Sequence, residues 1–168
     1  MKEQEPWLSG PVEGVQPVLM PAAHALAQCA GDLVRAVEDL TIEELWANPG
    51  GAPSVGFHLR HIAGSLDRLL TYARGESLSP AQFEALAAEG AIDESVDAAE
   101  LARNAVERIE EALRAIRSTP KAILFEKRVV GREKLPTNVF GLLFHLAEHT
   151  QRHTGQAITT AKIIKGGL

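Results

Sequence analysis

Six histidines are the residues of this sequence whose type and spacing could do chemistry. Five of them fall in two short segments, FHLRHIAGS (57–65) and FHLAEHTQRH (144–153). These five are His58, His61, His145, His149 and His153. Neutral imidazole is a common ligand of divalent transition metals, so two histidine segments that meet in the fold could hold an ion. The faces on which these histidines lie decide whether they can meet.

The segment after Pro136 has one apolar side when its residues are placed at about 100° per position. With His145 at zero, His149 lies near ~40° and His153 near ~80°, against an apolar stripe at roughly 60–160°. The stripe consists of Val139, Leu142, Leu143, Leu146 and Ala157. The pattern predicts that His149 and His153 point inward, one turn apart, where both could bind one ion. His145, at the edge of the stripe, is predicted at the rim.

The earlier histidine segment could supply a third ligand from a neighbouring helix. Its apolar stripe comprises Val55, Leu59, Ile62, Leu66, Leu69 and Ala73. His58 lies about 60° from His61 and closer to the stripe centre, so periodicity slightly favours His58, although either could contribute. Three neutral imidazoles leave a divalent ion with its full charge and an open position for water or substrate. His24 stands alone in an earlier segment and is a weaker candidate.

Inward histidines also occur in proteins without a catalytic metal. A single inward histidine is more often a hydrogen-bonded core residue than a ligand, whereas an inward pair with a third partner favours metal binding. A fourth histidine ligand, such as His58 or His24, would close the site and make the metal structural. Two familiar metal motifs are absent from the sequence: Leu146 stands where a zincin has glutamate, and the paired Glu-x-x-His motifs of di-iron bundles are missing.

Six further residues could take part in such a site or lie close to it. Cys29 has no basic neighbour and is interpreted as a small buried hydrophobe. Glu148 is predicted on the outer face of its helix, which argues against a role as general base. Gln156 is predicted at the inner edge, where it could orient a ligand or a water molecule. The arginines of the two histidine helices are predicted to be solvated charges that could attract an acidic thiol: Arg60, Arg68 and Arg152.

Four stretches combine helical periodicity with helix-boundary residues. They span about residues 18–39, 54–74, 97–118 and 137–165. Thr137 is the predicted N-cap of the last helix, and capping-box patterns at Thr41 and Ser79 predict two additional short helices. Residues 122–130 are β-prone and are predicted to form an extended crossover, with a small hairpin as the alternative. The fold class predicted is all-α, a four-helix bundle in a single domain (1–168) whose residues 1–16 form an arm.

Composition and charge limit the possible functions of this chain of 168 residues. A net charge of −5 without a basic stripe argues against nucleic-acid binding. A single cysteine allows no internal disulfide framework, which suits a reducing cytoplasm. Neither a signal peptide nor an apolar run of about 18 residues is visible. We therefore expect a cytoplasmic protein that binds neither nucleic acid nor membranes.

Two motifs resemble the DinB/YfiT-like superfamily of metal-binding four-helix bundles. They are SVGFHLRHIAGSLDRLL (54–70) and HLAEHTQRHTGQ (145–156). In that family a serine opens the second helix and a histidine ligand follows two turns later, while the fourth helix carries His-x-x-x-His, a small residue and Gln. The resemblance implies that the metal ligands are His61, which lies seven residues after Ser54, with His149 and His153. It thereby overrules the slight periodicity preference for His58.

The resemblance also implies a class of function. The family includes thiol-dependent S-transferases and isomerases, and proteins regarded as metal-dependent hydrolases. The implied cofactor is one divalent metal ion, with zinc or nickel favoured and iron or manganese as alternatives. The implied partners are a small-molecule substrate, a low-molecular-weight thiol and a second copy of the chain in a homodimer. The segment 79–92 is an insertion relative to the family, and it could cap the pocket or serve the dimer.

Overall fold

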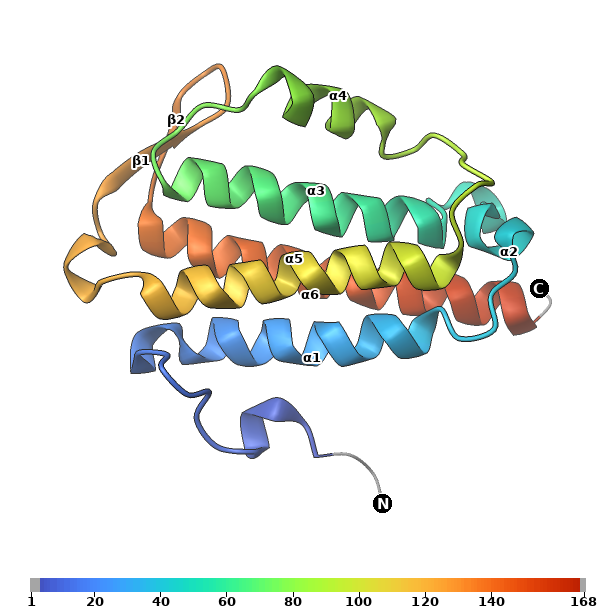
Figure 1. Cartoon of the computed structure of the whole chain (residues 1–168), viewed down its shortest axis with the longest axis horizontal. Helices are drawn as coiled ribbons and strands as arrows, with labels where there is room; N and C mark the ends of the chain where they lie inside the picture. Colours follow the sequence, from blue (N-terminus) through green and yellow to red (C-terminus); the bar gives the residue numbers. More distant parts are fainter. Residues whose placement is uncertain (1–3, 167–168) are drawn as a thin grey trace.

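Four long helices make up the body of the protein in the computed structural model, which describes residues 4–166 (Figure 1). They are α1 (Met20–Ala36), α3 (Val55–Ala73), α5 (Ala98–Ser118) and α6 (Val139–Gly166). Each packs against two others: α3 and α1 both contact α5 and α6. The helices α3 and α6, which carry the two histidine segments, run in opposite directions beside each other (Figure 1). The structure is mostly helical, as the sequence predicted.

The hydrophobic core lies between these helices and receives side chains from all of them. Its completely buried large residues include Leu26 and Leu33 from α1, Leu59 and Ile62 from α3, Ile109 and Ile116 from α5, and Leu146 from α6. Burying one such side chain contributes roughly 1.5–3 kcal/mol. Because the same stripe of α3 and α6 also borders the histidines, packing of the core fixes the relative position of the two histidine segments.

The ends of the helices are set by the predicted capping residues. The Ser54 hydroxyl accepts a hydrogen bond from the Phe57 N–H at the start of α3. Capping boxes begin the short helices α2 (Ile42–Trp46) and α4 (Pro80–Ala88), as predicted. These bonds satisfy N–H groups that have no partner within a helix, and they therefore fix where each helix begins.

The chain between α5 and α6 forms a small hairpin. After the short 3₁₀ helix η4 (Lys121–Ile123), β1 (Lys127–Val130) pairs antiparallel with β2 (Leu135–Asn138). The predicted N-cap, Thr137, lies in β2, and the next residue caps α6: the Asn138 side chain accepts a hydrogen bond from the Gly141 N–H at 2.7 Å. The Thr137 prediction was therefore wrong by one residue, because strand pairing continues up to Asn138.

Further short elements lie outside the four long helices. The N-terminal segment contains two 3₁₀ turns, η1 (Pro6–Leu8) and η2 (Pro17–Leu19), which both contact α1. A third 3₁₀ turn, η3 (Pro49–Gly51), precedes α3. The helix α4 lies along α3 (Figure 1) but contributes no buried residue to the core. Among the described residues, none of the helices is long and apolar enough to cross a membrane.

The cap of α3 gives a prediction about stability. Replacing Ser54 with alanine removes the hydroxyl that accepts from Phe57 N–H, and Ser54 is only 4% exposed. We expect Ser54→Ala to lower the free energy of unfolding by about 1 kcal/mol, measured by urea denaturation. Ser118→Ala, which alters an exposed hydroxyl at the end of α5, is the control and should cost less. Equal stability of Ser54→Ala and the wild type would contradict this role of the cap.

Candidate metal centre

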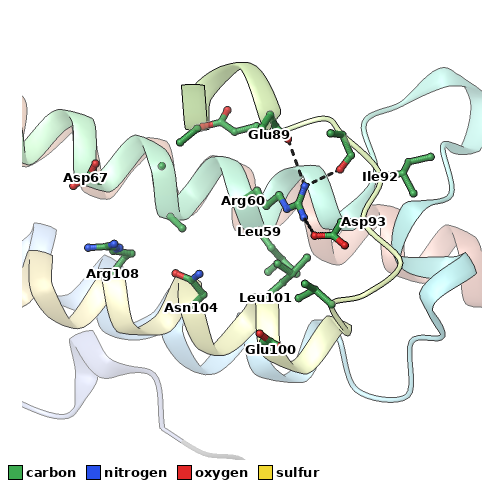
Figure 2. Close-up of a pocket in the computed structure, with 16 residues that line it drawn as sticks. Leu59, Arg60, Asp67, Glu89, Ile92, Asp93, Glu100, Leu101, Asn104 and Arg108 are labelled. Carbon is green, nitrogen blue, oxygen red and sulfur yellow. Dashed lines mark hydrogen bonds and ion pairs between the residues drawn. The ribbon is translucent and has the colours of Figure 1, made fainter. Parts of the chain in front are cut away.

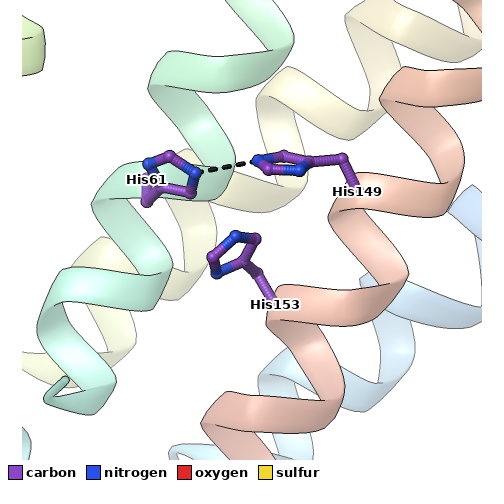
Figure 3. A group of neighbouring side chains, drawn as sticks. All are labelled: His61, His149 and His153. Atoms are coloured by element: carbon purple, nitrogen blue, oxygen red, sulfur yellow. Dashed lines mark hydrogen bonds between the residues drawn. The ribbon is translucent and has the colours of Figure 1, made fainter. Parts of the chain in front are cut away.

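Three histidines from two helices converge between α3 and α6 (Figure 3). His61 comes from α3, and His149 and His153 come from successive turns of α6. One ring nitrogen of each can be chosen so that the three atoms lie within 4.8 Å of one another. The structure thus brings together the three residues that the sequence motifs selected. In this arrangement the three ring nitrogens could hold one metal ion.

The rings meet through specific nitrogen atoms. The Nε2 atoms of His61 and His149 are 2.8 Å apart. The ring of His153 lies 4.3 Å from that of His61 and 4.6 Å from that of His149, measured between centroids. All three residues are half-buried, so the cluster is enclosed on the protein side and still reachable from solvent. We name these three residues the histidine triad.

The sequence around the pair on α6 explains why these two side chains point toward α3. His149 and His153 are separated by one helical turn and therefore lie on one face. Thr150 and Thr154 follow them on the buried side, and their hydroxyls donate to the carbonyl oxygens of Leu146 and Thr150 at 2.7 and 2.8 Å. Because these hydroxyls bond to carbonyl oxygens of their own helix, they are satisfied on its buried side and do not compete with the histidines for partners.

Burial keeps three of the clustered imidazoles neutral, those of His58, His149 and His153. The pKa of each of these three rings lies below the ordinary value of 6.5. Desolvation by burial is the largest cause, and the neighbouring His61 lowers the pKa further. The lowered pKa values are about 4 for His58, about 4 for His149 and about 3 for His153. At neutral pH these rings hold no charge, so a ring nitrogen of each is free to donate a lone pair.

The donor set fits a divalent cation. No carboxylate belongs to the histidine triad, and neutral imidazoles are the nitrogen ligands that zinc, nickel, iron and manganese accept. The Nδ1 atom of His149 is buried without a hydrogen-bond partner in the part of the chain that the structure describes. The hydrogen bonds of the cluster therefore leave one ring nitrogen of His149 unpaired, and a cation between the rings would replace the hydrogen bond that joins the Nε2 atoms of His61 and His149.

His58 lies behind the histidine triad rather than within it. Its side chain is 2% exposed, and its Nδ1 is 3.0 Å from the Nδ1 of His153. Periodicity had slightly favoured His58 over His61 as the ligand on α3, and the geometry brings His61 into the cluster. Both rings lie on the inner side of α3 and both contact the pair on α6, but His58 contacts His153 alone, whereas His61 lies beside both His149 and His153.

The remaining sequence-selected residues of α6 lie around the rim. His145 is largely exposed and contacts Glu148, which also pairs with Arg152. Glu148 thus faces outward, as predicted. Gln156 is exposed, so its predicted place at the inner edge is wrong. Its position on an ideal wheel lies at the margin of the stripe, where a small rotation of the helix decides exposure.

His24 and Cys29 both stand apart from the histidine triad. His24 Nε2 is 2.9 Å from the carbonyl oxygen of Gly10, so this ring holds the N-terminal segment against α1. Cys29 is buried, as predicted, and burial raises the pKa of its thiol to about 11. A thiol with that pKa is protonated at neutral pH and is a poor nucleophile.

The arginines of α3 behave differently from the prediction. Arg68 is 8% exposed and donates to Glu89 at 2.7 Å, so it is a buried, paired charge. Arg60 binds the chain after α4, whereas Arg152 on α6 is exposed and solvated as expected. The helical wheel could not show this pairing, because the partners come from the segment between α3 and α5.

The sequence did not identify Glu89 as a site residue. Glu89 caps the C-terminal end of α4, is 4% exposed, and contacts His61 Nδ1 through Oε2 at 2.7 Å. It also borders a hollow of about 680 Å³ between α3, the chain after α4 and α5 (Figure 2). The only sequence signal was the prediction that the insertion 79–92 could cover the pocket.

Comparison with known families agrees with this geometry. The family model of the DinB superfamily matches residues 25–157, which include the whole histidine triad. Because the match covers most of the chain, the chain belongs to the DinB superfamily, as the two histidine motifs predicted. A search of curated proteins finds no match.

The lowered histidine pKa values predict a pH dependence of stability. Between about pH 6.5 and pH 4, His58, His149 and His153 bind protons in the unfolded chain but stay unprotonated in the folded protein. Their stabilising contribution is therefore complete above pH 6.5 and is lost as the pH falls toward 4. Urea denaturation of the metal-free protein should show a lower free energy of unfolding at about pH 5.5 than at about pH 7.5.

A variant isolates the histidine contribution to this pH effect. His153→Gln removes the ring with the lowest pKa of the three, so its loss of stability over the same pH interval should be smaller. If the variant and the wild type lose the same stability, the His153 imidazole does not contribute to the pH dependence.

Proposed function

We propose that this chain is a metal-dependent enzyme, a four-helix bundle of the DinB type that holds one divalent cation with His61, His149 and His153. It would deliver a thiolate or a water molecule to an electrophilic small molecule, as a thiol S-transferase or a hydrolase. The observation that carries the proposal is the convergence of three imidazoles whose nitrogens lie within 4.8 Å of one another.

The chemistry of this ligand set supports an active rather than a closed site. Three protein ligands leave room for a further ligand in the tetrahedral arrangement that zinc favours. A cation in such a site lowers the pKa of a bound thiol or water toward neutrality. Zinc and nickel suit neutral imidazole best, and iron and manganese are the alternatives.

The chain's own residues define how a substrate could approach. The rings of the histidine triad are half-buried, and His145 and Arg152 flank them on the exposed side of α6. Arg152 is near enough to contribute to lowering the pKa of His149 and His153. Arg152 is paired with Glu148, so an anionic thiol would be recognised here by taking the place of that carboxylate beside the guanidinium, which is the basis for proposing an acidic low-molecular-weight thiol as co-substrate.

A second candidate function is a non-catalytic metal-binding protein, for example in a stress response. It is favoured by His58, whose buried ring lies 3.0 Å from His153. A shift of that ring toward the triad would supply a fourth imidazole and close the site, as in structural zinc centres. The enzyme proposal requires that His58 stays behind His153 and leaves one position open.

We further propose that the chain is one domain that acts in the cytoplasm as a homodimer. Support for a dimer comes from large apolar side chains that remain on the surface. Phe125, Leu135 and Phe144 are 71%, 57% and 54% exposed, respectively. Such side chains favour protein contacts when they gather in one patch. Analytical ultracentrifugation would distinguish the dimer from a monomer.

Removing one ligand tests the metal site directly. We expect His149→Ala, purified without an affinity tag, to fall from about one metal ion per chain to nearly none, since two imidazoles bind a divalent ion weakly. Turnover with a panel of thiols and electrophiles should be lost with the metal. His24→Ala is the control, because His24 contacts Gly10 far from the triad. Stoichiometric metal in His149→Ala would refute the ligand assignment.

The open position separates the enzyme from the second candidate. A small thiol added to the cobalt-loaded protein should produce a sulfur-to-cobalt charge-transfer band if one position is free. His58→Gln should leave this band in place, because His58 is not a ligand in the proposed site. The absence of the band in the wild type, with its appearance in His58→Gln, would instead favour a closed site with four imidazoles.

A further inference from the structure

Glu89 is a buried carboxylate that joins the inserted segment to the histidine triad. It lies directly after α4 and is 4% exposed. One of its oxygens, Oε2, is 2.7 Å from His61 Nδ1, and the other, Oε1, accepts from the Arg68 guanidinium at 2.7 Å. A buried carboxylate is costly unless its oxygens are paired, and here each oxygen has one partner.

The helix α3 is shaped to receive this carboxylate. His61, Gly64 and Arg68 lie on one face, spaced by three and four residues. A Cβ atom at Gly64 would lie 2.5 Å from Glu89 Oε1 and 2.6 Å from an Arg68 nitrogen, which is too close for any side chain. Glycine at this position therefore leaves the space in which Glu89 and Arg68 meet.

Arg60 holds the chain on both sides of Glu89, as Figure 2 shows. Its guanidinium donates to the carbonyl oxygens of Ala88 and Ala91 at 3.4 and 2.7 Å, and to the Asp93 carboxylate at 2.9 Å. It also lies 4.9 Å from the centre of the Trp46 ring. Because α4 buries no side chain in the core, these polar contacts fix the position of Glu89.

The contact with Glu89 decides which nitrogen of His61 faces the pair on α6. A carboxylate can only accept a hydrogen bond, so Nδ1 of His61 carries the proton and Nε2 keeps its lone pair. That Nε2 is the atom 2.8 Å from His149 Nε2. A carboxylate on the outer nitrogen of a histidine ligand orients the ring and strengthens it as a donor.

We propose that Glu89, held by Arg68, is a positioning residue of the metal centre. It fixes the tautomer and the ring plane of His61 so that Nε2 points into the histidine triad. The inserted segment that includes α4 thereby belongs to the site, although none of its residues lies in the triad. This inference rests on the proposed function, because it assumes that the triad binds a divalent cation.

The test compares zinc affinity in matched variants on the same segment. Glu89→Gln keeps the shape of the side chain and removes its charge, while Glu84→Gln changes an exposed carboxylate of α4 in the same way. In competition with a chromophoric chelator, we expect Glu89→Gln to bind zinc about tenfold more weakly than the wild type. Glu84→Gln should match the wild type.

Nitrogen-15 NMR of the metal-free protein shows directly which nitrogen of His61 carries the proton. If Glu89 only stabilised the fold, its replacement would leave this tautomer unchanged. The wild type should show His61 protonated at Nδ1, and Glu89→Gln should show a mixture of both tautomers. If Glu89→Gln fails to fold, Gly64→Ala replaces it, because the added Cβ displaces the carboxylate without removing it. It should weaken zinc binding in the same direction.

The possible outcomes separate the two proposals. A wild-type protein that binds no zinc overturns the proposed function. If the wild type binds zinc, and Glu89→Gln keeps both a zinc affinity within about twofold of the wild type and the Nδ1 tautomer of His61, only the positioning role of Glu89 is overturned. A tenfold loss with a changed tautomer supports both.

Discussion

The antiparallel packing of α3 against α6 is the constraint on which the rest of this structure depends. The same contact that buries Leu59, Ile62 and Leu146 also presses imidazoles from the two helices against each other. Burial removes water from the rings and lowers the pKa of His149 and His153, so they remain neutral at physiological pH. The Nε2 atoms of His61 and His149 share a hydrogen bond, and a divalent cation between the rings would replace that bond with lone-pair contacts from all three imidazoles.

Much of the site could be predicted because it depends on periodicity within single helices. The pair His149 and His153 follows from a spacing of four residues on an amphipathic helix, and the short helices at Thr41 and Ser79 follow from their capping boxes. The choice between His58 and His61 was different. Both lie on the inner side of α3 and both contact α6, and which of them joins the cluster with His149 and His153 depends on the rotation of one helix against another. The family motif selected His61, and the structure places His61 in that cluster.

The sequence could not predict features that depend on contacts between distant segments. Arg68 was interpreted as a solvated charge because its partner, Glu89, is 21 residues away and lies beyond the end of α4. Gln156 was placed inward by an ideal wheel, whereas the true helix exposes it. Both errors have one cause: a helical wheel describes a face of one helix and contains no information about what covers that face. The DinB family match covers residues 25–157 and so includes the whole triad, while the segment between α3 and α5 supplies Glu89.

The central claim is that three imidazoles from two helices share one ion, and X-ray absorption spectroscopy of the tag-free, metal-loaded protein tests it most directly. The account predicts one metal ion per chain with a first shell of about three imidazole nitrogens, near 2.0–2.1 Å if the metal is zinc. A shell of carboxylate oxygens without imidazole, or a protein that takes up no metal, would contradict it.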